Sequence, residues 1–217
     1  MKRKMISIVL IFALIAGGCS CAFWGVRGNG KLKTENRNIS DFSNIETAGA
    51  YLINVKCNQE PSLKITAEEN LLPYIRTKVY GKTLRIDTKK NISPRREIVI
   101  EIAVNDLKEL NCSGTNSIKV KDINTNEFTV NLSGAGNIKL SGVTEKLNAK
   151  ISGTGNLDAK ELKAEDVYVS VSGAGNAEVF SSNYLNASVS GVGSIDYYGN
   201  PAKTKTNVSG IGSIKRR

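Results

Sequence analysis

The sequence contains no histidine, and this absence excludes more chemistry than any other feature of its composition. Without histidine there is no Ser-His-Asp or Cys-His nucleophile, no histidine-ligated zinc and no histidine-held haem. Aromatic residues are also few, at 6% of the 217 residues, with a single Trp. Any catalysis would have to depend on carboxylates, Lys, Tyr or Cys. We therefore expect no enzyme activity, no catalytic residue and no cofactor.

A long apolar run is also missing, because the one such stretch is too short to span a bilayer. It extends from Met5 to Ala16, follows three basic residues and precedes Gly17 and Gly18. About 20 residues are needed for a membrane-spanning helix. A positive start, a short apolar run and small residues are typical of an export signal. The sequence predicts a signal peptide over residues 1–18.

Cys19 follows this leader directly. The stretch from Leu14 to Cys19 resembles a bacterial lipoprotein signal, in which the cysteine is acylated and becomes the first mature residue. We expect lipidation of Cys19, a tether over 19–27, and a protein exported and held by its lipid in the bacterial envelope, at the outer membrane. The alternative is an ordinary secretory peptide that is cut nearby, in which case Cys19 and Cys21 have no special role.

The net charge of +10 falls to +7 when the three basic residues of the leader are removed. The remaining chain has no basic helix and no motif of alternating basic and aromatic residues, so we expect no nucleic-acid partner. A solvated basic surface explains this charge, and anionic envelope polymers are an alternative. The expected partners are the membrane, through the lipid anchor, an envelope polysaccharide or protein, and a second copy of this chain in a homo-oligomer.

Eleven of the 20 glycines lie in six copies of one short motif, Ser-Gly-x-Gly-Asn/Ser. The copies begin at Ser113, Ser133, Ser152, Ser172, Ser190 and Ser209, which are 18 to 20 residues apart. The turn glycines of the last five copies are Gly134, Gly136, Gly153, Gly155, Gly173, Gly175, Gly191, Gly193, Gly210 and Gly212. A fixed period of this length is typical of a solenoid.

Apolar and polar residues alternate on both sides of each motif, as expected for half-buried strands. Each copy therefore predicts a strand, a glycine-rich turn, a second strand and a loop. Neither strand buries its apolar face alone, whereas copies stacked in register do. The glycines permit a positive φ and a close approach of backbones, and the Asn or Ser ending each turn can form ladders between copies. An all-β fold, a parallel β-helix or β-solenoid, is predicted; an antiparallel meander or sandwich is the alternative.

The region before the repeats is also rich in strand-forming residues but lacks the strict period. Stretches such as 51–55 and 98–102 are rich in Val and Ile. We expect residues 28–110 to form a less regular β-rich part, and residues 111–217 to form the repeat solenoid. The two parts are expected to make one continuous domain.

Three segments together resemble a known family. These are Gly28-Asn29-Gly30 with Arg37, Ile39, Phe42 and Ile45; Leu71 to Val79 with Gly81 and Leu84; and the repeat series up to Tyr198-Gly199-Asn200-Pro201. They are similar to the head GIN domain of putative auto-transporter adhesins, common among exported proteins of Bacteroidota. The resemblance implies a β-helix-like bacterial domain outside the cytoplasm, with an adhesin or surface-display role, and carries over no catalytic residues. The first copy departs from the motif at Asn116 and Ser117, which predicts a less regular coil there.

One outward column of the repeat carries acidic residues. Asp158, Glu178 and Asp196 occupy equivalent positions and would lie about 5 Å apart in stacked copies. We interpret them as a solvated ladder flanked by Lys139 and Lys215. The alternative is a cation site, or a carboxylate pair of an enzyme acting on polysaccharide.

Two cysteines lie beyond the leader and tether. Cys112 occupies an inward column that holds Leu, Ile or Val in the other copies, which predicts a buried thiol. A disulfide between Cys57 and Cys112 is the alternative, because an exported protein meets an oxidising environment.

Overall fold

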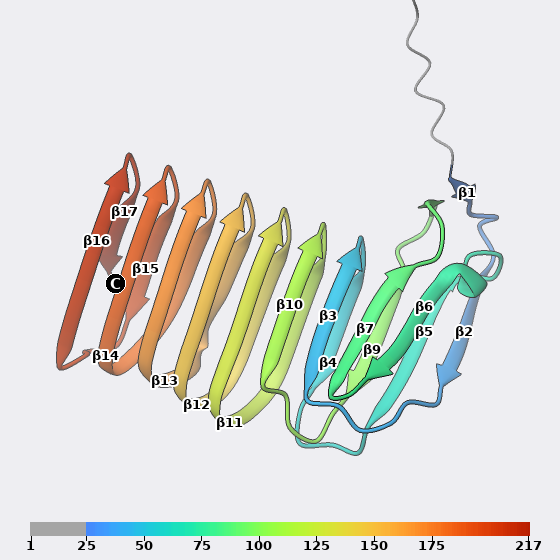
Figure 1. Cartoon of the computed structure of the whole chain (residues 1–217), viewed down its shortest axis with the longest axis horizontal. Coiled ribbons are helices and arrows are strands. Elements are labelled where there is room, and N and C mark those ends of the chain that lie inside the picture. Colours follow the sequence, from blue (N-terminus) through green and yellow to red (C-terminus); the bar gives the residue numbers. More distant parts are fainter. Residues whose placement is uncertain (1–24) are drawn as a thin grey trace, which may run out of the picture.

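The computed structural model describes residues 25–217, which form one long β-solenoid whose N-terminal end contains additional antiparallel strands (Figure 1). The predicted signal peptide, Cys19, Cys21 and most of the tether lie outside the described residues. The described part contains no α-helix, and its helical structure is limited to the 3₁₀ turn η1 (Leu72–Tyr74). No helix within residues 25–217 is long and apolar enough to cross a membrane.

The N-terminal part consists of ten short strands. They are β1 (Val26–Arg27), β2 (Leu32–Arg37), β3 (Asn44–Gly49), β4 (Leu52–Lys56), β5 (Ser62–Glu68), β6 (Ile75–Tyr80), β7 (Thr83–Thr88), β8 (Ile92–Ser93), β9 (Val99–Ala103) and β10 (Glu109–Gly114).

The repeat part contains longer strands. They are β11 (Ser117–Gly134), β12 (Asn137–Gly153), β13 (Asn156–Gly173), β14 (Asn176–Gly191), β15 (Ser194–Tyr198), β16 (Lys203–Gly210) and β17 (Ser213–Arg216). All pairs between successive copies are parallel, which confirms the β-solenoid and excludes the antiparallel alternative.

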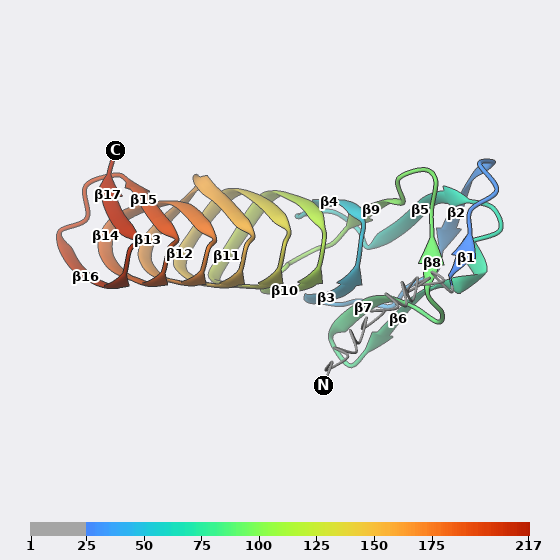
Figure 2. The ribbon, with the colours of Figure 1, turned by 90° about the horizontal axis from the view of Figure 1, so that it is seen from above.

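The solenoid has two faces, which meet at a glycine-rich corner and at a bulged corner (Figure 2). Face A contains β7, β3, β10, the second halves of β11 to β14, and β16, with β6 antiparallel at its edge. Face B contains β9, β4, the first halves of β11 to β14, β15 and β17, with β5 and β2 antiparallel at its edge.

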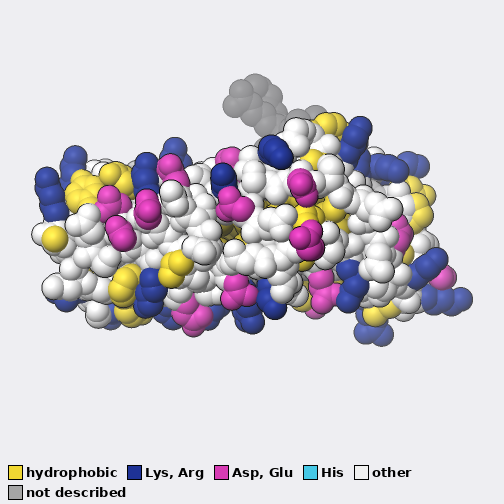
Figure 3. Space-filling view, turned by 90° about the horizontal axis from the view of Figure 1, so that it is seen from below, with side chains coloured by type: hydrophobic (Ala, Val, Ile, Leu, Met, Phe, Trp, Pro, Cys, Tyr) yellow, Lys and Arg dark blue, Asp and Glu magenta, His cyan; other side chains and the backbone are white. Residues whose placement is uncertain are grey.

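The second corner differs from the loop that the repeat predicts. Strand pairing continues through it, and β-bulges shift the register, for example between Lys139 and Ser141 in the pairing of β12 with β13. A bulge bends a strand without ending it, and so it turns the chain between the two faces. Figure 3 looks onto this corner and shows basic and acidic side chains interspersed along its length.

Apolar columns from both faces fill the interior. For example, Ile118, Ile138 and Leu157 stack on one another and are each 2% exposed. Buried residues of the N-terminal and repeat parts belong to one hydrophobic cluster, so no boundary divides the core at residue 110. Cys57 and Cys112 are both buried as free thiols, and burial, the largest cause in each case, raises both thiol pKa values to about 12.

The regular stack begins one coil earlier than the sequence repeat. Ala48, Gly49 and Tyr51 lie beside Ser113, Gly114 and Asn116 in the first recognised copy. Residues 57–108 are inserted after this early coil and build the N-terminal end. The copy at Ser113 stays in register with both neighbours, so the expectation of a less regular coil there was wrong. The Asn116 amide supplies extra bonds, accepting from the N–H of Tyr51 and donating to the Ser113 carbonyl.

Glu68 fastens the start of the described chain to the N-terminal end of the solenoid. Its carboxylate is fully buried and accepts the backbone N–H groups of Gly30 and Arg95, at 2.5 and 2.7 Å. Burial raises the pKa of Glu68, but hydrogen bonds from the N–H groups of Arg95, Gly30 and Arg96 lower it more, so the pKa lies below its ordinary value. One side chain thus joins two loops that are far apart in the sequence.

The two glycines of each motif have different roles. The first has a positive φ in most copies, for instance +120° at Gly173, where a Cβ would lie 2.6 Å from the carbonyl oxygen of Gly153. The second, such as Gly175, has an ordinary φ, but a Cβ there would lie 2.6 Å from the Gly155 carbonyl. Neighbouring coils therefore touch backbone to backbone at this corner.

We predict that Gly173→Ala lowers the free energy of unfolding by about 2–4 kcal/mol, because it adds a steric conflict to an unfavourable φ. Gly81→Ala is the matched control, since Gly81 has a φ of +60° but open space around its Cβ position. The control should cost about 1 kcal/mol. Urea unfolding measures the free energy of unfolding of both variants. Equal losses of free energy would show that the contact between coils at Gly173 adds no cost of its own.

Candidate functional site

Face B carries three outward columns of polar side chains that run along the solenoid axis. The first contains Asn137, Asn156, Asn176 and Ser194. Each of the last three donates a side-chain hydrogen bond to the residue before it, at 2.9, 3.0 and 2.7 Å. The predicted ladder is therefore present. Because it crosses several coils, it presents a regular row of amide groups along one edge of the face.

The second column contains Lys64, Glu101, Asn54, Lys119, Lys139, Asp158, Glu178, Asp196 and Lys215, in register from one end of the face to the other. The three predicted carboxylates are thus neighbours. Lys160 lies between two of them, with its Nζ 3.6 Å from Asp158 and 2.6 Å from Glu178. An ammonium group therefore occupies the position between these carboxylates that a bridging metal ion would need.

The other partners of the acidic residues differ from the prediction in one respect. Lys139 contacts Asp158 at 3.5 Å, as expected for a flanking cation. At the other end Arg217, and not Lys215, pairs with Asp196, at 2.8 Å. The carboxylates raise the pKa of their partners, with Glu161 the largest cause at Lys139, Glu178 at Lys160 and Asp196 at Arg217. Among residues 25–217, no group of three acidic or cysteine side chains is arranged to hold a metal ion.

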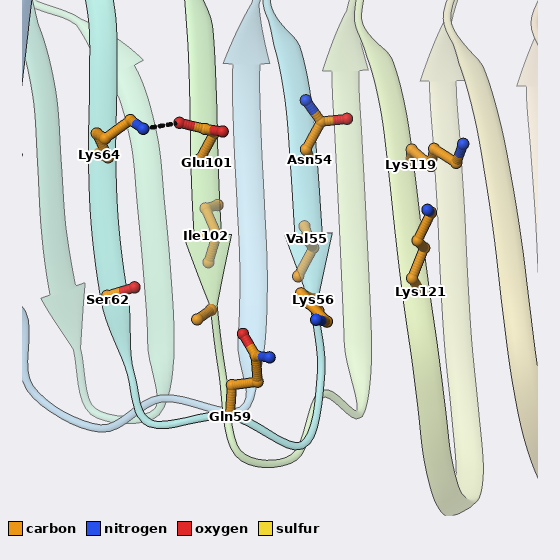
Figure 4. A pocket seen from close by; sticks show the side chains of 11 residues that line it. Asn54, Val55, Lys56, Gln59, Ser62, Lys64, Glu101, Ile102, Lys119 and Lys121 are labelled. Carbon is orange, nitrogen blue, oxygen red and sulfur yellow. Dashed lines mark ion pairs between the residues drawn. The ribbon is translucent and has the colours of Figure 1, made fainter.

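A hollow of about 500 Å³ lies near the N-terminal end of face B, where β5, β9, β4 and β11 run side by side (Figure 4). Ser62, Ala103, Lys56 and Lys121 form the third column there. Since Ser62 and Ala103 have small side chains, they leave space between the longer side chains around them. Lys64 reaches across to Glu101, at 2.5 Å, and the other lysines stand at the opposite side.

A second hollow of about 310 Å³ continues from the first. Both are lined by Asn54 and Lys119, and the second extends past Asn137 to Asn156 and Asp158. The two hollows are therefore adjacent and together span six strands, and we call this pair of hollows the trough. At about 4.8 Å for each strand spacing, it extends over roughly 24 Å along the solenoid axis.

The sequence analysis did not find this trough. Two of its strands, β5 and β9, come from the insertion that follows the early coil and lie outside the repeat. A partial signal was present, because Leu52-Ile53-Asn54-Val55 has the same pattern as Ser117-Ile118-Lys119-Val120, its partner in register. Aligning these two segments would place Asn54 beside Lys119.

The C-terminal end of the solenoid is open among the described residues. Strand β16 pairs with β14 on one side and is exposed throughout, and Ile211 is 89% exposed. Open edges of this kind can pair with another chain. Self-association stays a prediction.

Comparison with known proteins agrees with this architecture. Residues 41–201 match the family model described as putative auto-transporter adhesin, head GIN domain. The chain belongs to this family. The match includes the early coil, the inserted strands and the whole trough, and ends shortly before β16. No curated protein sequence matches the chain significantly.

Solved structures show the same fold at low sequence identity. A putative adhesin from Bacteroides fragilis has a TM-score of 0.71 and 23% identity, over 89% of this chain and all of the other. A putative adhesin from Parabacteroides merdae has a TM-score of 0.55 and 22% identity, over 89% and 99% of the two chains. A putative lipid binding protein from Parabacteroides distasonis has a TM-score of 0.54 and 24% identity, over 88% and 99%.

We predict that the Asp158→Asn, Glu178→Gln double variant responds to calcium no differently from the wild type, because Lys160 already bridges these carboxylates. Thermal unfolding with and without calcium chloride should show no shift for either protein. The free energy of unfolding should change by less than about 1 kcal/mol, as for exposed ion pairs. A calcium-dependent stabilisation of the wild type that disappears in the variant would instead support a cation site.

Proposed function

We propose that this protein is a non-enzymatic binding module of the bacterial envelope, exported, anchored by a lipid on Cys19 at the outer membrane, and adhesin-like in role. The trough on face B would be its binding surface. Membership of the adhesin family supports a surface-binding role. The observation that carries the proposal is the adjacency of the two hollows, which share Asn54 and Lys119 and together span six strands along the solenoid axis.

The shape and lining of the trough favour an extended polymer as ligand, with an envelope polysaccharide preferred over a protein. A trough along the axis accommodates a chain, and its Asn, Gln and Ser side chains can donate to and accept from hydroxyl groups. One structural neighbour is described as a putative lipid binding protein. In this chain, however, Lys56, Lys119 and Lys121 line the first hollow, and an acyl chain there would displace water from their charged ammonium groups at a cost.

The competing function is a polysaccharide-cleaving enzyme that uses Asp158 and Glu178. Against it, both side chains contact Lys160, and Glu178 also accepts a hydrogen bond from the Tyr198 hydroxyl at 3.3 Å. These contacts hold both carboxylates against other side chains of the protein, so neither carboxylate is free to act as acid or nucleophile. No specific observation favours this second function.

A panel of soluble polysaccharides tests the binding role. We expect the purified protein to retard at least one of them in affinity electrophoresis and to release no new reducing ends or unsaturated products from any. Binding without cleavage supports a binding module. Product formation that disappears in the Asp158→Asn, Glu178→Gln double variant would establish the enzyme instead.

The lipid anchor is tested in cells. Wild-type protein should incorporate labelled palmitate and sediment with membranes, because acyl chains on Cys19 would bury in the bilayer. Cys19→Ser should lose both properties, whereas the matched variant Cys21→Ser should keep them. If Cys19→Ser still incorporates palmitate and sediments, the anchor is elsewhere.

A further inference from the structure

We propose that the ligand of the trough is a polyanionic polysaccharide, held by Lys56, Lys119 and Lys121. This inference rests on the proposed function and adds the charge class of the ligand. It follows from the distribution of ion pairs on face B, from the register of the three lysines and from the form of the trough.

Two lysines in the second column of face B, and Lys160 beside it, have carboxylate partners in the chain. Lys64 pairs with Glu101, Lys139 with Glu161 and Asp158, and Lys160 with Glu178. In contrast, Lys56, Lys119 and Lys121 form no ion pair with any carboxylate of residues 25–217, and all three are exposed. Three lysines without a carboxylate partner in the described chain therefore line the same hollow.

The register places these three charges close together. Lys121 and Lys56 are direct partners on neighbouring parallel strands, where like charges repel. Lys119 lies two residues before Lys121 on β11 and points to the same side of the sheet, about 7 Å away. Such a cluster is unfavourable unless water, salt or a bound anion screens the ammonium groups. A bound anionic polymer would supply the missing negative charge.

The side chains around the three lysines favour a polysaccharide over other polyanions. Asn54, Gln59 and Ser62 line the same hollow and can hydrogen-bond to sugar hydroxyls, but no aromatic side chain lines it. Single-stranded nucleic acids bind largely by stacking on aromatic rings, which the hollow cannot provide. An anionic bilayer is flat and would meet the rims of the trough, whereas a polysaccharide chain can lie in it. Charge and hydrogen bonds make this binding sensitive to salt.

Dextran sulfate and polygalacturonate, each paired with its neutral form (dextran and methyl-esterified polygalacturonate), test the proposal. In affinity electrophoresis or calorimetry, the wild type should bind an anionic polymer and bind the neutral form at least about tenfold more weakly. The triple variant Lys56→Gln, Lys119→Gln, Lys121→Gln should lose about tenfold or more in affinity, as three partly solvated charge contacts would predict. Wild-type affinity should also fall as sodium chloride rises.

The matched control is Lys150→Gln, Lys203→Gln, Lys205→Gln, which removes the same net charge from exposed positions on face A. It should bind within about twofold of the wild type, and thermal unfolding should show that both triple variants fold. Equal losses in both variants would overturn the proposal, because binding would then depend on net charge alone. So would lysine-dependent binding to phosphatidylglycerol vesicles without binding to either polymer.

Two outcomes distinguish a wrong ligand charge from a wrong function. If the wild type binds dextran as tightly as dextran sulfate, the trough binds polysaccharide but the inference about charge is wrong. If it binds no polymer, neutral or anionic, the proposed function is wrong as well.

Discussion

Direct contact between backbones at the glycine-rich corner is the constraint on which the rest of the structure depends. A Cβ at the first glycine of a motif would meet the carbonyl of the coil below, as at Gly173 over Gly153. The coils can therefore approach to the spacing of a β-sheet only while the first glycine position of each motif lacks a side chain. Once they do, hydrogen bonds hold every coil in register, and the interior columns pack apolar residue on apolar residue.

The strand register decides which residues lie next to one another on the surface. Residues 18 to 20 apart become neighbours, which is why Asn137, Asn156 and Asn176 form a ladder. The same rule places like charges side by side, and the ion pairs show which of these charges are neutralised by a partner. Lys160 compensates the acidic part of face B, whereas Lys56, Lys119 and Lys121 have no carboxylate partner in the described chain. Fold and candidate ligand class thus follow from one geometric rule.

The periodic features were predictable from the sequence, and the non-periodic ones were not. The fixed spacing of Ser-Gly-x-Gly-Asn/Ser leads directly to stacked coils, inward columns and the Asn ladder. The early coil was missed because Tyr51 replaces the second glycine and a long insertion separates it from the next copy. Lys160 was missed as a bridge because it lies beside a bulge, where register shifts are set by packing. The trough was missed because β5 and β9 join the face out of sequence order.

The most direct measurement of the central claim is lysine acetylation footprinting by mass spectrometry, with and without bound dextran sulfate. The account predicts that the polymer protects Lys56, Lys119 and Lys121 from acetylation. Lys150, Lys203 and Lys205, on the opposite face, should react equally in both conditions. Protection on face A, or equal protection of both sets, would contradict the claim that the trough on face B is the binding site.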